Sequence, residues 1–127
     1  MVSDILTKRW KKLNEFAPVS HLSEQERHCL RIQAKTLRYA CEFVGNAFPG
    51  AAHTEQCEHL SAHLGSLQDY LGKLNDVVSL RERLHTMNGD ITPSAIIKGK
   101  ASRRHLLKAA EIAQELVLRQ KPFWQSF

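Results

Sequence analysis

The sequence predicts an all-α protein, an antiparallel bundle of four helices. Three observations lead to this fold class. Apolar residues recur at helical spacing along four segments. No stretch shows the clean alternation of polar and apolar residues that marks a half-buried strand. Short connections separate the four segments, as is typical of an up-down-up-down bundle. The 127 residues are enough for one domain with its own hydrophobic core.

The first two helices are expected over residues 4–16 and 24–48. The first ends before Pro18, because the residue that precedes a proline is biased away from helical geometry. The second begins after Ser23, which forms a capping-box pattern with Glu26 three residues later. A Pro-Gly pair directly after the second helix is a clear stop signal.

The third and fourth helices are expected over residues 54–86 and 93–119, with an Asn-Gly-Asp turn between them. Gly65 and Gly72 lie inside the third segment and weaken the prediction of one straight helix. Gly72 would also allow a neighbouring helix to approach closely. Pro93 suits the first turn of the fourth helix.

The net charge of +5 and the isoelectric point near 9.3 suggest an anionic partner. The charge is unevenly placed: residues 1–50 carry +3, residues 51–90 carry −3 and residues 91–127 carry +5. In an antiparallel bundle the first and last segments could meet. The two basic segments could then share one positive surface.

The cysteines and the hydropathy indicate the compartment. Three cysteines cannot all pair and show no CxxC spacing, so we expect free thiols in the cytoplasm. No run approaches 18 apolar residues, and no charged-then-apolar signal segment opens the chain. We therefore expect no membrane partner.

A row of basic residues lies on the second helix. His28, Arg31, Lys35 and Arg38 fall within an arc of about 80°, at about 100° per residue. We call these four residues the basic row. Apolar residues flank it on both sides, so we expect the row to line a groove between packed helices; the two flanks are Ala34, Leu37 and Cys41, and Ile32, Tyr39 and Phe43. The alternative is a solvated helix face whose side-chain stems cover the core.

Basic residues on the first and last helices are further candidates. Arg9 projects into the apolar face of the first helix, and Lys12 lies at the edge of that face. Arg103 falls inside the apolar arc of the fourth helix. An unpaired buried charge is expensive, so Arg9 needs either an ion-pair partner such as Asp76 or a bound anion.

Two motifs in this order resemble the CHAD family, the conserved histidine α-helical domain. The first is His28-x-x-Arg31-Ile32-x-x-Lys35-x-Leu37-Arg38-Tyr39. The second is Leu67-Gln68-x-x-Leu71-Gly72-x-x-Asn75-Asp76. The closing Lys121-Pro122-Phe123-Trp124 is also similar to the end of such domains. The resemblance runs from the first helix to the end of the chain.

The resemblance implies an all-helical domain that binds inorganic polyphosphate without catalysis or cofactors. The expected ligands are the basic row, with contributions from Arg9, Lys12 and Arg103. Complete family members carry two related helical halves, and residues 1–127 match only the second half. The chain is therefore expected to be a half-length domain, either a fragment that lacks its N-terminal half or a short form that makes a homodimer. Its expected location is the cytoplasm, including polyphosphate granules.

Two other binding classes remain as alternatives. Histidine phosphotransfer modules are also four-helix bundles with an exposed histidine, and His28 with Arg31 partly fits them. However, Ile32 stands where those modules favour glycine. A basic bundle could also hold the phosphates of a nucleic acid. However, Tyr39 is the only aromatic residue that interleaves the basic row and could stack on bases, so we do not expect nucleic acid.

A metal enzyme is disfavoured. Glu55, His59 and His63 share one face of the third helix, with Cys57 nearby, but a solvated histidine-rich turn explains them better. Di-iron bundles need two Glu-x-x-His motifs, and residues 82–85 supply only one. We expect no metal site and no catalytic residues.

Overall fold

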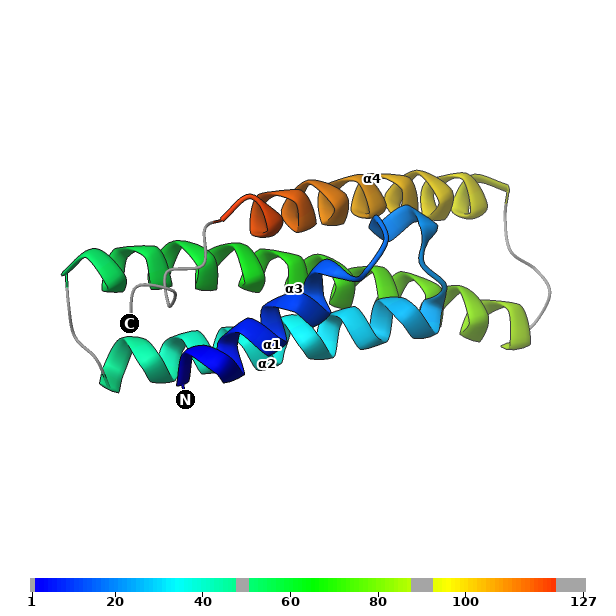
Figure 1. Cartoon of the computed structure of the whole chain (residues 1–127). Helices are drawn as coiled ribbons and strands as arrows, with labels where there is room; N and C mark the ends of the chain where they lie inside the picture. The colour runs from blue at the N-terminus through cyan, green and yellow to red at the C-terminus, as the bar shows by residue number, and fades with distance from the viewer. Residues whose placement is uncertain (1, 48–50, 88–92, 121–127) are drawn as a thin grey trace.

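A computed structural model of the chain contains four α-helices and one short 3₁₀ helix (Figure 1). Their bounds are Val2–Asn14 for α1, Val19–His21 for η1, Glu24–Ala47 for α2, Ala51–Met87 for α3 and Pro93–Leu118 for α4. The structure describes the backbone of residues 2–47, 51–87 and 93–120, and the side chains of residues 4–46, 55–77 and 102–120. Over these residues the all-α prediction is confirmed.

Several sequence expectations fall outside the described residues. They are the Pro-Gly stop at 49–50, the turn at 88–90 and the closing motif at 121–124. The side chains of the Glu-x-x-His motif at 82–85 also fall outside them.

The start of α2 is fixed by the predicted capping box. The backbone N–H of Glu26 donates to the hydroxyl of Ser23 at 3.2 Å, and the backbone N–H of Ser23 donates to the carboxylate of Glu26 at 3.1 Å. These two bonds satisfy donors that a helix start leaves without a partner. The prediction from the sequence is therefore confirmed, and the first residues of α2 have a defined position.

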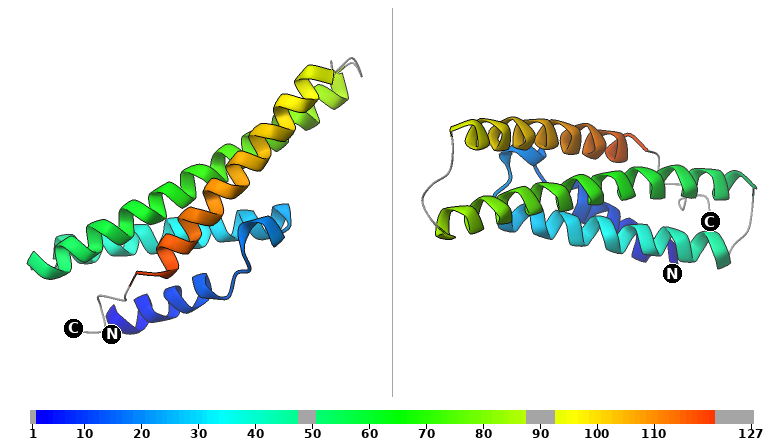
Figure 2. Two further views of the ribbon diagram at one scale, coloured as in Figure 1. Left: turned by 90° about the horizontal axis from the view of Figure 1, so that it is seen from above. Right: turned by 180° about the vertical axis from the view of Figure 1, so that it is seen from behind.

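The third helix is continuous over 37 residues despite Gly65 and Gly72. It runs antiparallel to both α2 and α4, and its C-terminal end extends with the start of α4 beyond α2 (Figures 1 and 2). The short helix α1 packs against α2, and η1 packs against α4. The order α1–α2–α3–α4 is that of an up-down bundle.

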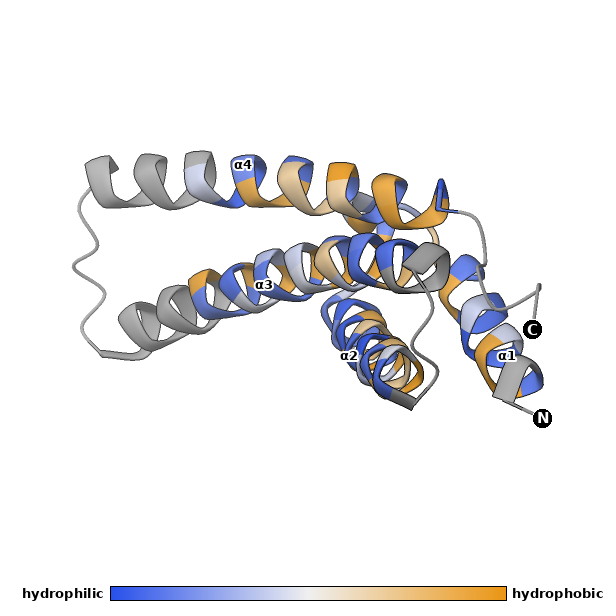
Figure 3. Ribbon diagram, turned by 90° about the vertical axis from the view of Figure 1, so that its left-hand side faces the viewer, coloured by the Kyte–Doolittle hydropathy of each residue, from blue (hydrophilic) through white to orange (hydrophobic). Residues whose placement is uncertain are grey.

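One hydrophobic core holds the helices together. Apolar side chains of α2 and α3, among them several leucines, supply most of it, and Figure 3 shows that each helix carries both hydrophilic and hydrophobic residues. Burial of one leucine side chain contributes about 1.5–3 kcal/mol. The fully buried side chains with the largest volumes are Leu6, Leu13, Leu30, Leu37, Leu60, Leu64, Leu67, Leu74, Val19, Val117 and Cys41.

Two side chains of α4 fasten the connection between α1 and α2. The buried amide of Gln114 accepts a hydrogen bond from the N–H of Val19 at 3.0 Å and donates to the carbonyl of Ala17 at 2.9 Å. The carboxylate of Glu111 accepts from the N–H of Ser20 at 2.8 Å. These bonds fix the loop that leads into α2.

Candidate functional site

The basic row of α2 divides into two kinds of side chain. Arg31 and Arg38 are half-buried, whereas His28 and Lys35 are exposed. Arg31 and Arg38 are seven residues apart, so they leave the helix in nearly the same direction. That direction leads to α3.

Each of these two arginines lies against a glycine of α3. A Cβ atom placed on Gly72 would lie 3.4 Å from Nη2 of Arg31 and 3.6 Å from its Cζ and Nε. A Cβ atom placed on Gly65 would lie 3.5 Å from Nη1 of Arg38 and 3.9 Å from its Cδ. The expectation that Gly72 allows close approach therefore holds for a side chain of the neighbouring helix.

Polar atoms without partners gather along this contact. Three buried polar atoms have no hydrogen-bond partner among the described residues: Nε of Arg31, Nε of Arg38 and Oε1 of Gln68. Gln68 lies between the two glycines in sequence. The nearest ion pair is Nε of Arg38 with Glu42, at 3.8 Å, beyond hydrogen-bond distance. Buried polar groups in proteins usually have partners, so this edge of the bundle has unused hydrogen-bonding capacity.

The ring of Tyr39 contributes to the middle of the row. The Cζ atom of Arg38 lies 5.3 Å from the centre of the ring, and Nζ of Lys35 lies 5.8 Å from it. Both distances are within the range of a cation–π interaction. The ring therefore helps to hold the two cations on the same side of α2.

A small cleft extends the row toward the start of α2. Its lining residues come from α2 and α3 and are Glu24, Arg27, His28, Arg31, Leu71 and Asn75. Asn75 of the second sequence motif thus lies beside His28 and Arg31 of the first. The structure brings the two motifs together at one site, as their order along two antiparallel helices allows.

Arg27 is a member of this cleft that the sequence reasoning missed. Its guanidinium is half-buried, and its pKa is lowered first by burial and then by the charge of Arg103 on α4; Glu24 partly offsets both effects. Arg103 is itself half-buried, and its Nε is buried without a hydrogen-bond partner. The structure therefore brings the predicted candidate Arg103 close to the start of the row.

The apolar flanks of the row behave differently from the prediction. Ala34, Leu37 and Cys41 are buried in the core, as expected. Ile32, Tyr39 and Phe43, however, are 46%, 50% and 68% exposed. The prediction of a groove with two apolar walls is therefore wrong for the described residues of this chain, because no described helix packs on the second flank.

The candidates Arg9 and Lys12 lie on α1, apart from the cleft at the start of α2. Arg9 is half-buried and Lys12 is exposed, and α1 packs against α2. Neither residue lines the cleft at the start of α2. The structure thus gathers Arg27, Arg31 and Arg38 along one helix and leaves Arg9 and Lys12 on another.

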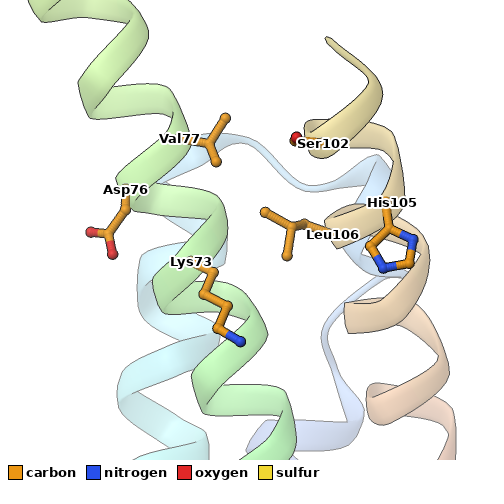
Figure 4. Close-up of a pocket in the computed structure, with 6 residues that line it drawn as sticks. All are labelled: Lys73, Asp76, Val77, Ser102, His105 and Leu106. Atoms are coloured by element: carbon orange, nitrogen blue, oxygen red, sulfur yellow. The ribbon is translucent and has the colours of Figure 1, made fainter. Parts of the chain in front are cut away.

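A second, more open cleft lies between α3 and α4 (Figure 4). Leu106 of α4 points into it toward α3, whereas Asp76 points away from it. Its lining residues are Lys73, Asp76, Val77, Ser102, His105 and Leu106. Asn75 and Asp76, adjacent in the second motif, therefore line two different clefts.

The side chains considered for a metal site do not form one within the described residues. His59 contacts Glu55 at 3.7 Å, one helical turn away, and both are exposed. Among the described side chains, no group of three or more His, Cys, Asp or Glu could hold one metal ion. The described helices also include none with an apolar stretch long enough to cross a bilayer.

Comparisons with known proteins agree with the motif resemblance. A family model described as CHAD domain matches residues 1–85, which include all of α1 and α2 and nearly all of α3. No curated protein and no solved structure matches the chain.

Proposed function

We propose that this chain, which belongs to the CHAD domain family, binds inorganic polyphosphate along the basic row of α2 without chemical turnover. One observation carries the proposal. Arg31 and Arg38 are held half-buried on α3, and each has a buried Nε without a hydrogen-bond partner in the part of the chain that the structure describes. A linear polyanion beside α2 would supply acceptors and negative charge along this edge.

The spacing of the arginines suits an extended ligand. Arg31 and Arg38 are seven residues apart, which is about 10.5 Å along the helix, and Lys35 lies between them. Arginine offers a planar fork of donors, and lysine offers a compact point charge. Contact with successive phosphates of one chain would satisfy all three cations.

The start of α2 supports the same ligand. Arg27 and Arg103 come close enough for their charges to repel, and His28 and Asn75 lie beside Arg27. A bound anion would relieve this repulsion.

A titration with polyphosphate of defined length across a range of salt concentrations tests the site. The variant is Arg31→Ala/Lys35→Ala/Arg38→Ala. The matched control removes three exposed cations from α4 instead: Arg104→Ala/Lys108→Ala/Arg119→Ala. Both variants lower the net charge equally, so long-range attraction changes by the same amount.

The expected result is a large and selective loss. A hydrogen bond to a charged group contributes about 1.5–3 kcal/mol, and about 1.4 kcal/mol is a tenfold change in affinity. The α2 variant should therefore bind at least 100-fold more weakly, whereas the α4 control should lose only a few-fold. Equal losses in the two variants would refute a site on α2.

Three further measurements separate this function from its alternatives. Equal affinity for duplex DNA and polyphosphate at matched salt would contradict the preference for polyphosphate. Transfer of labelled phosphate onto His28 would favour a phosphotransfer module. Release of inorganic phosphate from bound polyphosphate would contradict a non-catalytic role.

A further inference from the structure

We infer that Gly65 and Gly72 are positioning residues that form a platform on α3 for the guanidinium groups of Arg38 and Arg31. The inference rests on the proposed function, because it concerns how the polyphosphate ligands are presented. The two glycines touch the arginines and leave the ligand contacts to them.

The register of the two helices shows that the contacts form a repeat. Arg31 lies on Gly72 and Arg38 lies on Gly65. The two arginines are seven residues apart on α2, and the two glycines are seven residues apart on α3. The two helices run in opposite directions. Two successive arginines of α2 therefore meet two successive glycines of α3, with Lys35 level with Gln68 between them.

The contact distances limit the size of a side chain that could replace either glycine. At both positions a Cβ atom would lie 3.4 Å or more from the arginine, which is ordinary van der Waals contact. An alanine would therefore fit beneath the guanidinium. A longer side chain would place its γ and δ atoms where the guanidinium lies, and the arginine would have to leave α3.

Burial of the Nε atoms gives the platform a physical consequence. An arginine side chain that moves freely in solution loses rotamer entropy when it binds a ligand, and this loss weakens binding. On the platform the guanidinium is already confined, with Nε buried and one terminal nitrogen nearest the glycine. The N–H donors that point away from α3 remain for a polyanion.

Two substitutions at one position separate positioning from folding. Gly72→Ala should raise stability, because glycine inside a helix is destabilising relative to alanine. It should keep the affinity for polyphosphate within twofold. Gly72→Leu should keep at least the stability of the wild-type chain, since leucine is also a good helix former. Its affinity should nevertheless fall about tenfold.

The salt dependence provides a readout that a purely structural role would not change. Each lost phosphate contact lowers the slope of log K against log salt concentration by about 0.7–0.9 for nucleic acids, and a similar change is expected here. Gly72→Leu should show this change, and the double variant Gly65→Leu/Gly72→Leu should show about twice as much. The control Ser66→Leu adds the same side chain to an exposed position of α3 and should match the wild-type chain.

A measurement without ligand keeps the inference separate from the proposed function. In a ¹H–¹⁵N spectrum, the Nε–H of Arg31, assigned with Arg31→Lys, should exchange with water more slowly than that of the exposed Arg104. Gly72→Leu should remove this protection and Gly72→Ala should preserve it. Protection that persists in folded Gly72→Leu would overturn the platform, and so would unchanged affinity and slope in that variant. Loss of protection in a chain that binds no polyphosphate would leave the platform standing and reject the proposed function.

Discussion

Substitution of Gln114 tests how much its hydrogen bonds to the loop between α1 and α2 stabilise the fold. We consider the substitution Gln114→Met, which keeps the length of the side chain and its helix propensity but removes both hydrogen bonds. The N–H of Val19 then loses its acceptor at a residue with 0% exposure. An unsatisfied buried group costs about 1–3 kcal/mol. Ala17 is exposed, so water can replace the bond to its carbonyl at little cost.

The free energy of unfolding should therefore fall by about 2 kcal/mol, mainly because the buried N–H of Val19 loses its hydrogen-bond acceptor. Urea unfolding followed by circular dichroism measures it, and this loss should lower the midpoint by about 1 M for a typical slope. The control is Gln120→Met, whose amide only donates to the carbonyl of Leu116 one turn earlier at 3.3 Å. That control should stay within about 0.5 kcal/mol of the wild-type chain. A similarly small loss in Gln114→Met would refute the reasoning.

Two further predictions concern ionisable groups. Hydrogen bonds from Ser20 lower the pKa of the Glu111 carboxyl in the folded chain. The ionised carboxylate therefore stabilises the fold above the unfolded pKa of about 4.3. This stabilisation is lost as the pH falls through the lower pKa of the folded chain. The stability advantage of the wild-type chain over Glu111→Gln should accordingly shrink between pH 6 and pH 3 in urea unfolding; an advantage that grew toward acid would contradict the assignment. Burial raises the pKa of the Cys41 and Cys57 thiols, whereas Cys29 is exposed. Iodoacetamide at pH 8 should label only Cys29 in the folded chain, as read by mass spectrometry, and equal labelling of all three would show that the core is not closed.

The sequence predicted the helices well because their signals are local. The two residues of the capping box, Ser23 and Glu26, are only three positions apart, and the bounds of α2 differ from the prediction by one residue. The amide of Gln114 could not be foreseen, since its partner Val19 is 95 residues away in the chain. Contacts of this kind depend on how the helices pack, which periodicity alone does not determine.

The candidate site was predicted in part. The basic row was assigned to one arc, but burial separates Arg31 and Arg38 from His28 and Lys35. A search for cations within a narrower arc of α2 would have found Arg27. Arg27, Arg31 and Arg38 share an arc of only about 40° beside the core. The role of the two glycines could not be derived, since it depends on the register between α2 and α3.

The contacts of α4 have a consequence for where this domain can be cut. The family match ends at residue 85, yet α4 begins at Pro93 and supplies Ala110, Ala113 and Val117 to the core. A chain shortened to the matched region would expose the leucines of α3 to solvent and leave the N–H of Val19 without its acceptor. We expect such a fragment to aggregate or to remain partly folded. Deletion and fusion experiments should therefore retain the chain through Leu118, because motif boundaries and folding boundaries do not coincide in this protein.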